Sequence, residues 1–236
     1  MRKVLICLAF LLLPGKSFAG APALLLHHAI GDVRSTFFSW PAAVVAGGAA
    51  AAWISSSFDE EVKNHFRGGR DLGKADTVAD FVGKPYVWDS AALGVFGIGR
   101  LAHKETLAFT GENLVEALAF TEAMTGGLKL GFRRDRSNGG SYSFPSGHAA
   151  RTFAAAAVLE TLHGPAAGIP AFLAAGFISY SRLDANEHHV SDVVFGAALG
   201  SAIGWGTTRF HKSENPKWAL APLSGEAKGI QFFSLW

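Results

Sequence analysis

Three short stretches of the chain place basic side chains and histidines at spacings that suit one kind of chemistry, the binding of a phosphate group and attack on its phosphorus. The residues at these spacings are three cations, a turn that can begin a helix, two histidines and a carboxylate. The stretches are Lys129 to Arg136, Pro145-Ser146-Gly147-His148, and Ser181-Arg182 followed by His188 and Asp192.

The three cations suit the charge that develops on a transferring phosphoryl group. Negative charge spreads over the equatorial oxygens, and the protein must neutralise it while holding the attack in line. An arginine fork can bind two oxygens at once, and a lysine adds a mobile point charge. Lys129, Arg136 and Arg182 are therefore candidate phosphate ligands. A lysine and an arginine seven residues apart are by themselves typical of a solvated surface, so only the combination carries this interpretation.

The tetrapeptide Pro145-Ser146-Gly147-His148 precedes an alanine-rich run that predicts a helix. Free backbone N–H groups at a helix start bind anions. Ser146 would cap this helix, and Gly147 would let the backbone approach an oxygen closely. His148 would stand at the edge of the phosphate, where it can protonate a leaving oxygen. An ordinary capped helix with a surface histidine explains the tetrapeptide alone equally well.

His188 and Asp192 are four residues apart and would share one face of a helix. A carboxylate beside an imidazole fixes its tautomer and stabilises the cation that forms later. The other ring nitrogen is then free to attack phosphorus and form a phosphohistidine. A plain helix pair is an alternative, and so is a metal site that includes His189. No acidic cluster or histidine-x3-histidine pair supports a metal, and we expect no cofactor.

The three patterns together resemble the type 2 phosphatidic acid phosphatase superfamily, which includes bacterial acid phosphatases, lipid phosphatases and vanadium haloperoxidases. The shared pattern is Lys-x6-Arg, then Pro-Ser-Gly-His, then Ser-Arg-x5-His-x3-Asp, and it covers roughly residues 129–192. The resemblance implies a helical bundle and hydrolysis without a metal. It implies His188 as the nucleophile, Asp192 as its orienting partner and His148 as the general acid. The implied phosphate ligands are Lys129, Arg136, Ser146, Gly147 and Arg182.

Two positions depart from the pattern of this superfamily. Ser137 stands where the superfamily usually has proline after the arginine of the first motif. This change loosens the loop but removes no catalytic atom. His189 stands where the residue after the nucleophile is often aromatic, so the wall of the pocket is expected to differ.

The elements that must position these residues are predicted to be helices. We expect the all-α class, as a single-domain helical bundle with a short irregular or hairpin C-terminal tail. Apolar periodicity predicts helices over residues 37–57, 91–101, 106–124, 149–162, 169–180 and 188–207.

Three segments carry further expectations. In the helix over residues 106–124, Glu112 and Glu116 lie opposite the leucine face and are expected to form its wet side. The glycine-rich, basic residues 126–143 predict a loop. The charged residues 59–80 are expected to lie on the surface.

The chain divides into residues 1–19, with the features of a secretory signal, a helical domain over 20–215 and a tail over 216–236. An uncleaved anchor is the alternative reading of the first segment. The one cysteine, Cys7, lies inside that segment, which excludes disulfides and cysteine metal sites from the mature chain. We expect an exported protein, periplasmic or elsewhere in the cell envelope.

Composition leaves membrane association open. Hydrophobic residues make up 49% of the chain, and the formal net charge of +2 gives no sign of nucleic acid binding. Residues 37–57 are long enough for one membrane crossing, whereas the later apolar runs favour buried helices of a soluble or peripheral bundle.

The sequence therefore predicts a metal-independent phosphatase of phosphate monoesters or diphosphates. Its partner would be a phosphorylated lipid or another phosphate ester, with a membrane surface as a second partner and the oligomeric state left open. Export and the apolar helices favour lipid-linked substrates. A vanadate-dependent haloperoxidase is an alternative for which the chain is short. A second alternative is a non-enzymatic phospholipid-binding envelope protein.

Overall fold

The computed structural model describes residues 21–68, 71–214, 218–222 and 230–234. The expected signal over residues 1–19 lies outside them. The described helices are α2 (Ala21–Phe37), α3 (Pro41–Ser55), α4 (Asp59–His65), α5 (Lys74–Val82), α6 (Pro85–Leu101), α7 (Glu105–Phe132), α8 (Gly147–His163), α9 (Pro165–Asp184) and α10 (Val190–Glu214), with short 3-10 turns at Ser56–Phe58 and Phe66–Gly68.

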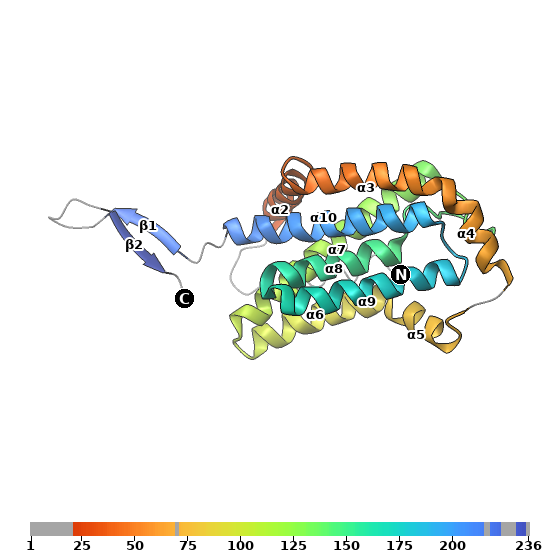
Figure 1. Cartoon of the computed structure of the whole chain (residues 1–236). Coiled ribbons are helices and arrows are strands. Elements are labelled where there is room, and N and C mark those ends of the chain that lie inside the picture. The colour runs from red at the N-terminus through yellow and green to blue at the C-terminus, as the bar shows by residue number, and fades with distance from the viewer. Residues whose placement is uncertain (1–20, 69–70, 215–217, 223–229, 235–236) are drawn as a thin grey trace.

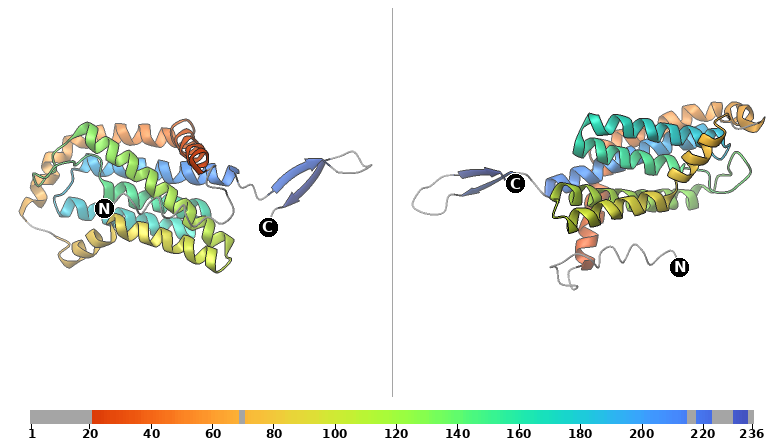
Figure 2. Two further views of the ribbon diagram at one scale, coloured as in Figure 1. Left: turned by 180° about the vertical axis from the view of Figure 1, so that it is seen from behind. Right: turned by 90° about the horizontal axis from the view of Figure 1, so that it is seen from below.

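The long helices lie side by side in one bundle, so the all-α prediction is confirmed (Figure 1). α10 packs against α8, α3, α2 and α7, and α8 also packs against α9. After α10, strand β1 (Trp218–Pro222) pairs antiparallel with β2 (Ile230–Ser234). The tail is thus the hairpin alternative, and both views of Figure 2 show it extending beyond the bundle.

Glycines set the close approach of α8 and α10. A Cβ added at Gly196 would lie 2.7 Å from the carbonyl oxygen of Ser146. Cβ atoms at Gly200 and Gly204, one and two turns further along, would meet the carbonyl oxygens of Ala150 and Ala154. Because these positions are four residues apart, they form one face of α10. This face allows backbone-to-backbone packing, which holds the starts of the two helices together.

The core lies between α6, α7, α8 and α10. It contains small and branched apolar residues, which fit helices that approach closely. The cluster consists of Ala92, Leu114, Ala117, Leu118, Ala155, Val158, Leu199 and Ile203.

Two expectations about loop and surface segments hold only in part. α7 continues through the first part of the expected loop to Phe132, with Met124 and Leu128 packed against the core. Most of the described residues of 59–80 are exposed, as expected, but Asp59 and Asp76 are buried, at 5% and 1% exposed.

The expected wet side of α7 also differs from the prediction. The side chain of Glu116 is only 12% exposed and contacts His28 and His211. The charge of Glu116 is therefore compensated by other helices rather than by water.

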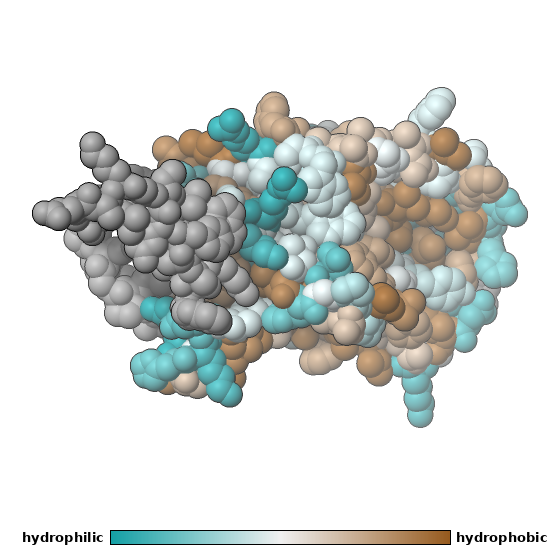
Figure 3. Space-filling view, turned by 60° about the vertical axis from the view of Figure 1, so that its left-hand side comes forward, coloured by the Kyte–Doolittle hydropathy of each residue, from teal (hydrophilic) through white to brown (hydrophobic). Residues whose placement is uncertain are grey.

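Much of the surface is apolar. Among the described residues, Pro41–His65 is long and apolar enough to cross a membrane, and only 17% of the apolar part of this stretch is buried. Trp53 and Ile54 within it are 80% and 62% exposed. Figure 3 shows broad brown areas of apolar side chains on the visible face. Such large exposed apolar areas mark sites of membrane or protein contact.

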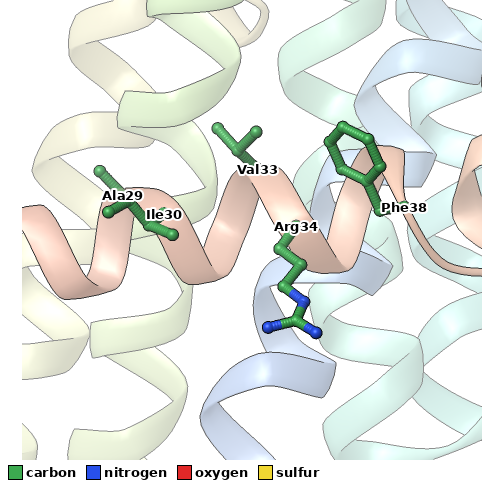
Figure 4. A pocket seen from close by; sticks show the side chains of 5 residues that line it. All are labelled: Ala29, Ile30, Val33, Arg34 and Phe38. Carbon is green, nitrogen blue, oxygen red and sulfur yellow. The ribbon is translucent and has the colours of Figure 1, made fainter.

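A cavity of about 670 Å³ lies along α2 (Figure 4). It is lined by Ala29, Ile30, Val33, Arg34 and Phe38. None of the residues predicted to bind phosphate lines it, so its position does not bear on the chemistry of the three motifs.

Candidate phosphate site

The three motifs meet at one end of the bundle. Lys129 lies in the last turn of α7, Ser146 precedes α8, and Arg182 lies in the last turn of α9. His188 comes just before α10, and Asp192 is in its first turn. Figure 1 places the ends of α7 and α9 and the starts of α8 and α10 together, beside α4 and α5. The structure therefore brings together residues that are up to 63 positions apart in the sequence.

The start of α8 is built as the sequence predicts. The Ser146 hydroxyl accepts a hydrogen bond from the backbone N of Ala149 at 3.4 Å, so Ser146 is the N-cap. The backbone N of Ser146 donates to the carbonyl oxygen of Asp192 at 3.0 Å, which ties the start of α8 to α10. Gly147 faces Lys129, whose Cε would be 3.9 Å from an added Cβ. A helix start beside a lysine is suited to an anion.

His188 and Asp192 are linked through a third side chain. His188 Nδ1 is 3.7 Å from Asp192 Oδ2, which is beyond a normal hydrogen bond. The Ser143 hydroxyl donates to Asp192 Oδ2 and lies 3.3 Å from His188 Nδ1. Because Ser143 has one proton and gives it to Asp192, it must accept from His188 Nδ1–H. This arrangement leaves Nε2 of His188 unprotonated.

Asp192 is held as an anion by several donors. It accepts from Arg134 Nη1 at 2.8 Å and from the backbone N of His189 at 2.9 Å. The ring Nδ1 of His189 lies 3.2 Å away. Burial alone would favour the protonated acid, but the neighbouring His188 and the hydrogen bonds from His189 and Ser143 lower the pKa of Asp192. The unusual His189 thus helps to stabilise the negative charge of Asp192, in addition to any part it has in the wall of the pocket.

His188 is neutral at neutral pH. It is 4% exposed, and burial lowers its pKa below the usual value, although Asp192 opposes this shift. The positive charges of Lys129 and Arg136 also contribute to lowering the pKa. A neutral imidazole with a free Nε2 has the lone pair that a nucleophile needs.

The cations bind protein groups within the cluster. Arg182 is 1% exposed and contacts Asp80 at 2.6 Å and Asp76 at 3.2 Å. The Glu187 carboxylate lies 3.1 Å from Arg136 and 3.5 Å from Arg182. Two of the predicted phosphate ligands thus converge on one anionic oxygen.

Lys129 donates to the carbonyl oxygen of Tyr142 at 2.6 Å. Burial first, and then the positive charge of Arg136, lower the pKa of Lys129 to about 8. This lysine is therefore charged at neutral pH but loses its proton more readily than an ordinary lysine does.

His148 lies beside the same group of charged residues and contacts them through Asp80 of α5. Its Nε2 is 3.6 Å from Asp80 Oδ1 and has no hydrogen-bond partner among the described residues. Burial, and then the charge of Arg182, lower the pKa of His148 to about 4. Gly83 packs directly on the ring, because a Cβ at this glycine would meet His148 Cδ2.

Sequence reasoning missed several residues of this cluster. Ser143 and Arg134 lie in the basic loop, and Arg134 also binds Asp59 at 2.7 Å. Asp76, Asp80, Gly83 and Glu187 complete the surroundings. The one available signal was the group of acidic residues in 59–80, which could pair with the arginines of the first and third motifs.

Comparison with known proteins identifies a family with which this chain shares sequence similarity. The family model for the PAP2 superfamily matches residues 111–216. The chain is 32% identical over 165 residues to "Lipid A 1-phosphatase" of Porphyromonas gingivalis, an overlap of 66% of this chain and 35% of that protein. It is 32% identical over 136 residues to "Lipid A 4'-phosphatase" of Helicobacter pylori, an overlap of 56% of this chain and 66% of that protein.

The fold has a counterpart among solved structures. The crystal structure of a transmembrane PAP2 type phosphatidylglycerolphosphate phosphatase from Bacillus subtilis matches with a TM-score of 0.62 and 21% identity. The match covers 73% of this chain and 96% of the other. The chain spans about a third of the P. gingivalis protein and about two thirds of the H. pylori protein.

Proposed function

Because the chain belongs to the PAP2 superfamily, we propose that it is a phosphatase that hydrolyses a lipid-linked phosphate monoester or diphosphate through a phosphohistidine. The observation that supports this most directly is the neutral, buried His188, held beside Lys129 and Arg136 with its Nε2 free. The named activities of the relatives concern lipid A and phosphatidylglycerol phosphate.

In the first step of this mechanism, Nε2 of His188 attacks phosphorus while the P–O bond to the leaving group breaks. The Ser143 hydroxyl accepts from the Nδ1–H of the imidazolium that forms and donates to Asp192, whose negative charge stabilises this cation. Lys129, Arg136, Arg182, the hydroxyl of Ser146 and the backbone N–H of Gly147 hold the equatorial oxygens. The carboxylate of Glu187 must then give way to phosphate, since it engages Arg136 and Arg182.

His148 is the proposed general acid. A pKa of about 4 makes it neutral without substrate. A phosphate dianion bound beside it would raise that pKa, so that the proton arrives together with the substrate. His148 then protonates the leaving oxygen. In the second step it takes a proton from water, which attacks phosphorus and breaks the N–P bond to release inorganic phosphate.

Membrane association follows from the exposed apolar surface. The exposed α3 and the lipid phosphates named for the relatives both favour a bilayer as the place of reaction. We also propose that residues 1–19 direct export to the cell envelope and that residues 216–236 form a separate tail. A mature N-terminus at Gly20, and retention in membranes after an alkaline wash, are the expected results.

The test of function measures phosphate release from lipid A, phosphatidylglycerol phosphate, a polyprenyl diphosphate and a soluble ester, each in EDTA. We expect turnover of at least one lipid substrate, and loss of it in a folded His188→Ala variant. Rapid quenching with a ³²P-labelled substrate should trap an acid-labile phosphoprotein. Undiminished turnover by His188→Ala would refute the mechanism, and binding of lipid phosphates without turnover would favour the non-enzymatic alternative.

A further inference from the structure

A second cluster of titratable side chains lies away from the phosphate site. His28 of α2, Glu116 of α7 and His211 of α10 meet in the bundle. Figure 1 shows α2 beside the end of α10 that leads to the hairpin. Asp192 and His211 are 19 residues apart on α10, which corresponds to about 28 Å along a helix. The cluster therefore cannot touch a phosphate group held at the phosphate site.

The three side chains already converge on a small volume. Glu116 lies 2.9 Å from His28 Nδ1 through Oε1 and 2.6 Å from His211 Nε2 through Oε2. One nitrogen or oxygen atom from each residue lies within 4.8 Å of the others. Ligand atoms around a tetrahedral zinc ion, at bond lengths of about 2.0–2.1 Å, are about 3.3 Å apart. Small side-chain rotations would bring these three atoms to that spacing.

Asp32 is a candidate fourth donor, because its carboxyl group lies close enough to Glu116 and His211 to interact with their charges. Asp32 lies one turn after His28 on α2, so the two share a helix face. Asp32 is 5% exposed, and its Oδ1 has no hydrogen-bond partner among the described residues. A buried carboxylate oxygen without a partner is costly, and a cation satisfies it.

We propose that His28, Glu116, His211 and Asp32 bind a divalent transition metal ion, with zinc as the best fit. Two imidazoles and carboxylates are the donors that zinc takes in proteins. The site would be structural, because it joins α2 to α7 and α10 far from the three motifs. It does not depend on the proposed phosphatase function.

The charges around the cluster agree with a cation. Burial, and then the nearby Glu116, raise the pKa of Asp32 to about 7. Two carboxylates in one buried place repel each other, and a divalent ion removes this repulsion. The ring of Phe210 lies 5.9 Å from that of His28 and 5.5 Å from that of His211. This apolar wall limits access of water, which strengthens the binding of an ion.

The alternative is a hydrogen-bonded network without metal. In that case Glu116 alone holds the two imidazoles. Although burial opposes the charged form, the carboxylate of Glu116 raises the pKa of His211. The metal site and the metal-free network differ in two measurable ways. Only the metal site predicts that a metal ion binds, and only the metal site predicts that replacing Asp32 changes this binding.

The experiment titrates Co²⁺ into the purified, EDTA-treated full-length protein, followed by Zn²⁺. We expect one equivalent of Co²⁺ with the intense visible absorption of a four-coordinate ion, which Zn²⁺ displaces. Zn²⁺ should also raise the melting temperature. Mutation of a residue that only supports a metal ligand typically lowers metal affinity by about 10- to 100-fold. His28→Gln and Glu116→Gln remove ligands themselves and should lower the affinity for Co²⁺ and Zn²⁺ by more than this. Asp32→Asn should weaken binding or change the cobalt spectrum.

The matched control is His65→Gln, which removes an exposed histidine from α4 and should bind as the parent protein does. No saturable Co²⁺ or Zn²⁺ binding by the parent protein would overturn the proposal, and so would equal binding by folded His28→Gln. Phosphate release should persist in EDTA whatever the state of this cluster. A phosphatase without this metal site, or a metal site without phosphatase activity, separates the two proposals.

Discussion

His188 Nδ1 lies 3.7 Å from Asp192 Oδ2, and the Ser143 hydroxyl bridges the two groups. The carboxylate thus acts on the imidazole largely through a serine from a different loop. This relationship explains how the ring is held in one tautomer without a direct short contact, and it makes Ser143 a positioning residue.

Ser143→Ala should reduce kcat while leaving the fold intact. The buried Nδ1–H loses its acceptor, and an unsatisfied buried group costs about 1–3 kcal/mol. If the whole effect appears in the transition state, kcat falls by about 5- to 150-fold. The effect on KM should be small, since Ser143 is not a proposed phosphate ligand. Steady-state kinetics on a lipid phosphate measure both constants, and Ser141→Ala, at an exposed position, is the control. A parent-like kcat would show that Asp192 needs no bridge.

Gly83→Ala should disable His148 without removing it. The added Cβ would collide with the His148 ring and come 3.0 Å from Ile178 Cγ2. A displaced general acid slows substrates with poor leaving groups by about 100-fold or more. An ester with a good leaving group, such as a nitrophenyl phosphate, needs little protonation and should be affected much less.

The control for this change is Gly176→Ala, since a Cβ at Gly176 would meet nothing within 4 Å. His148→Ala should show the same dependence on the leaving group as Gly83→Ala. Equal losses on both kinds of ester would mean that Gly83 acts on the fold rather than on His148.

The pH profile should have a basic limb set by Lys129. Its pKa is about 8, and a lysine is charged only below its pKa. As the pH rises through that value, the phosphate site loses one positive charge, so kcat/KM should fall. Lys129→Arg keeps the charge to much higher pH, and its limb should move upward. A limb at the same pH in both proteins would assign the ionisation to another group.

Sequence patterns predicted the helical class and the start of α8 at Ser146-Gly147, because both depend on local spacing. The convergence of the three motifs was expected from their combination and from the family that they resemble. The loop expected over 126–143 was wrong in its first part, since packing of Leu128 on the core offsets the low helix propensity of glycine. The pairing of Glu116 with His28 and His211 depends on three helices meeting, which no local pattern encodes.

Asp59 shows the same limit of local patterns. It was expected on the surface, yet it accepts from the backbone N of Ser191 at 3.0 Å and from Ser191 Oγ at 2.6 Å. It also binds Arg134, which in turn binds Asp192. Asp59 therefore anchors both the start of α10 and the arginine beside the catalytic carboxylate.

Asp59→Ala should lower stability and kcat together. Loss of a buried acceptor with several donors costs about 1–3 kcal/mol or more, which thermal unfolding would report as a lower melting temperature. Because the start of α10 then loses its hydrogen bonds to Asp59, the neighbouring His188 is less well ordered and phosphate release should slow. Glu60→Ala is the control. Glu60 is next to Asp59 in the sequence but is exposed, and among the described contacts its carboxylate pairs with Lys63. If Asp59→Ala melted and turned over like Glu60→Ala, α4 would have no part in positioning the site.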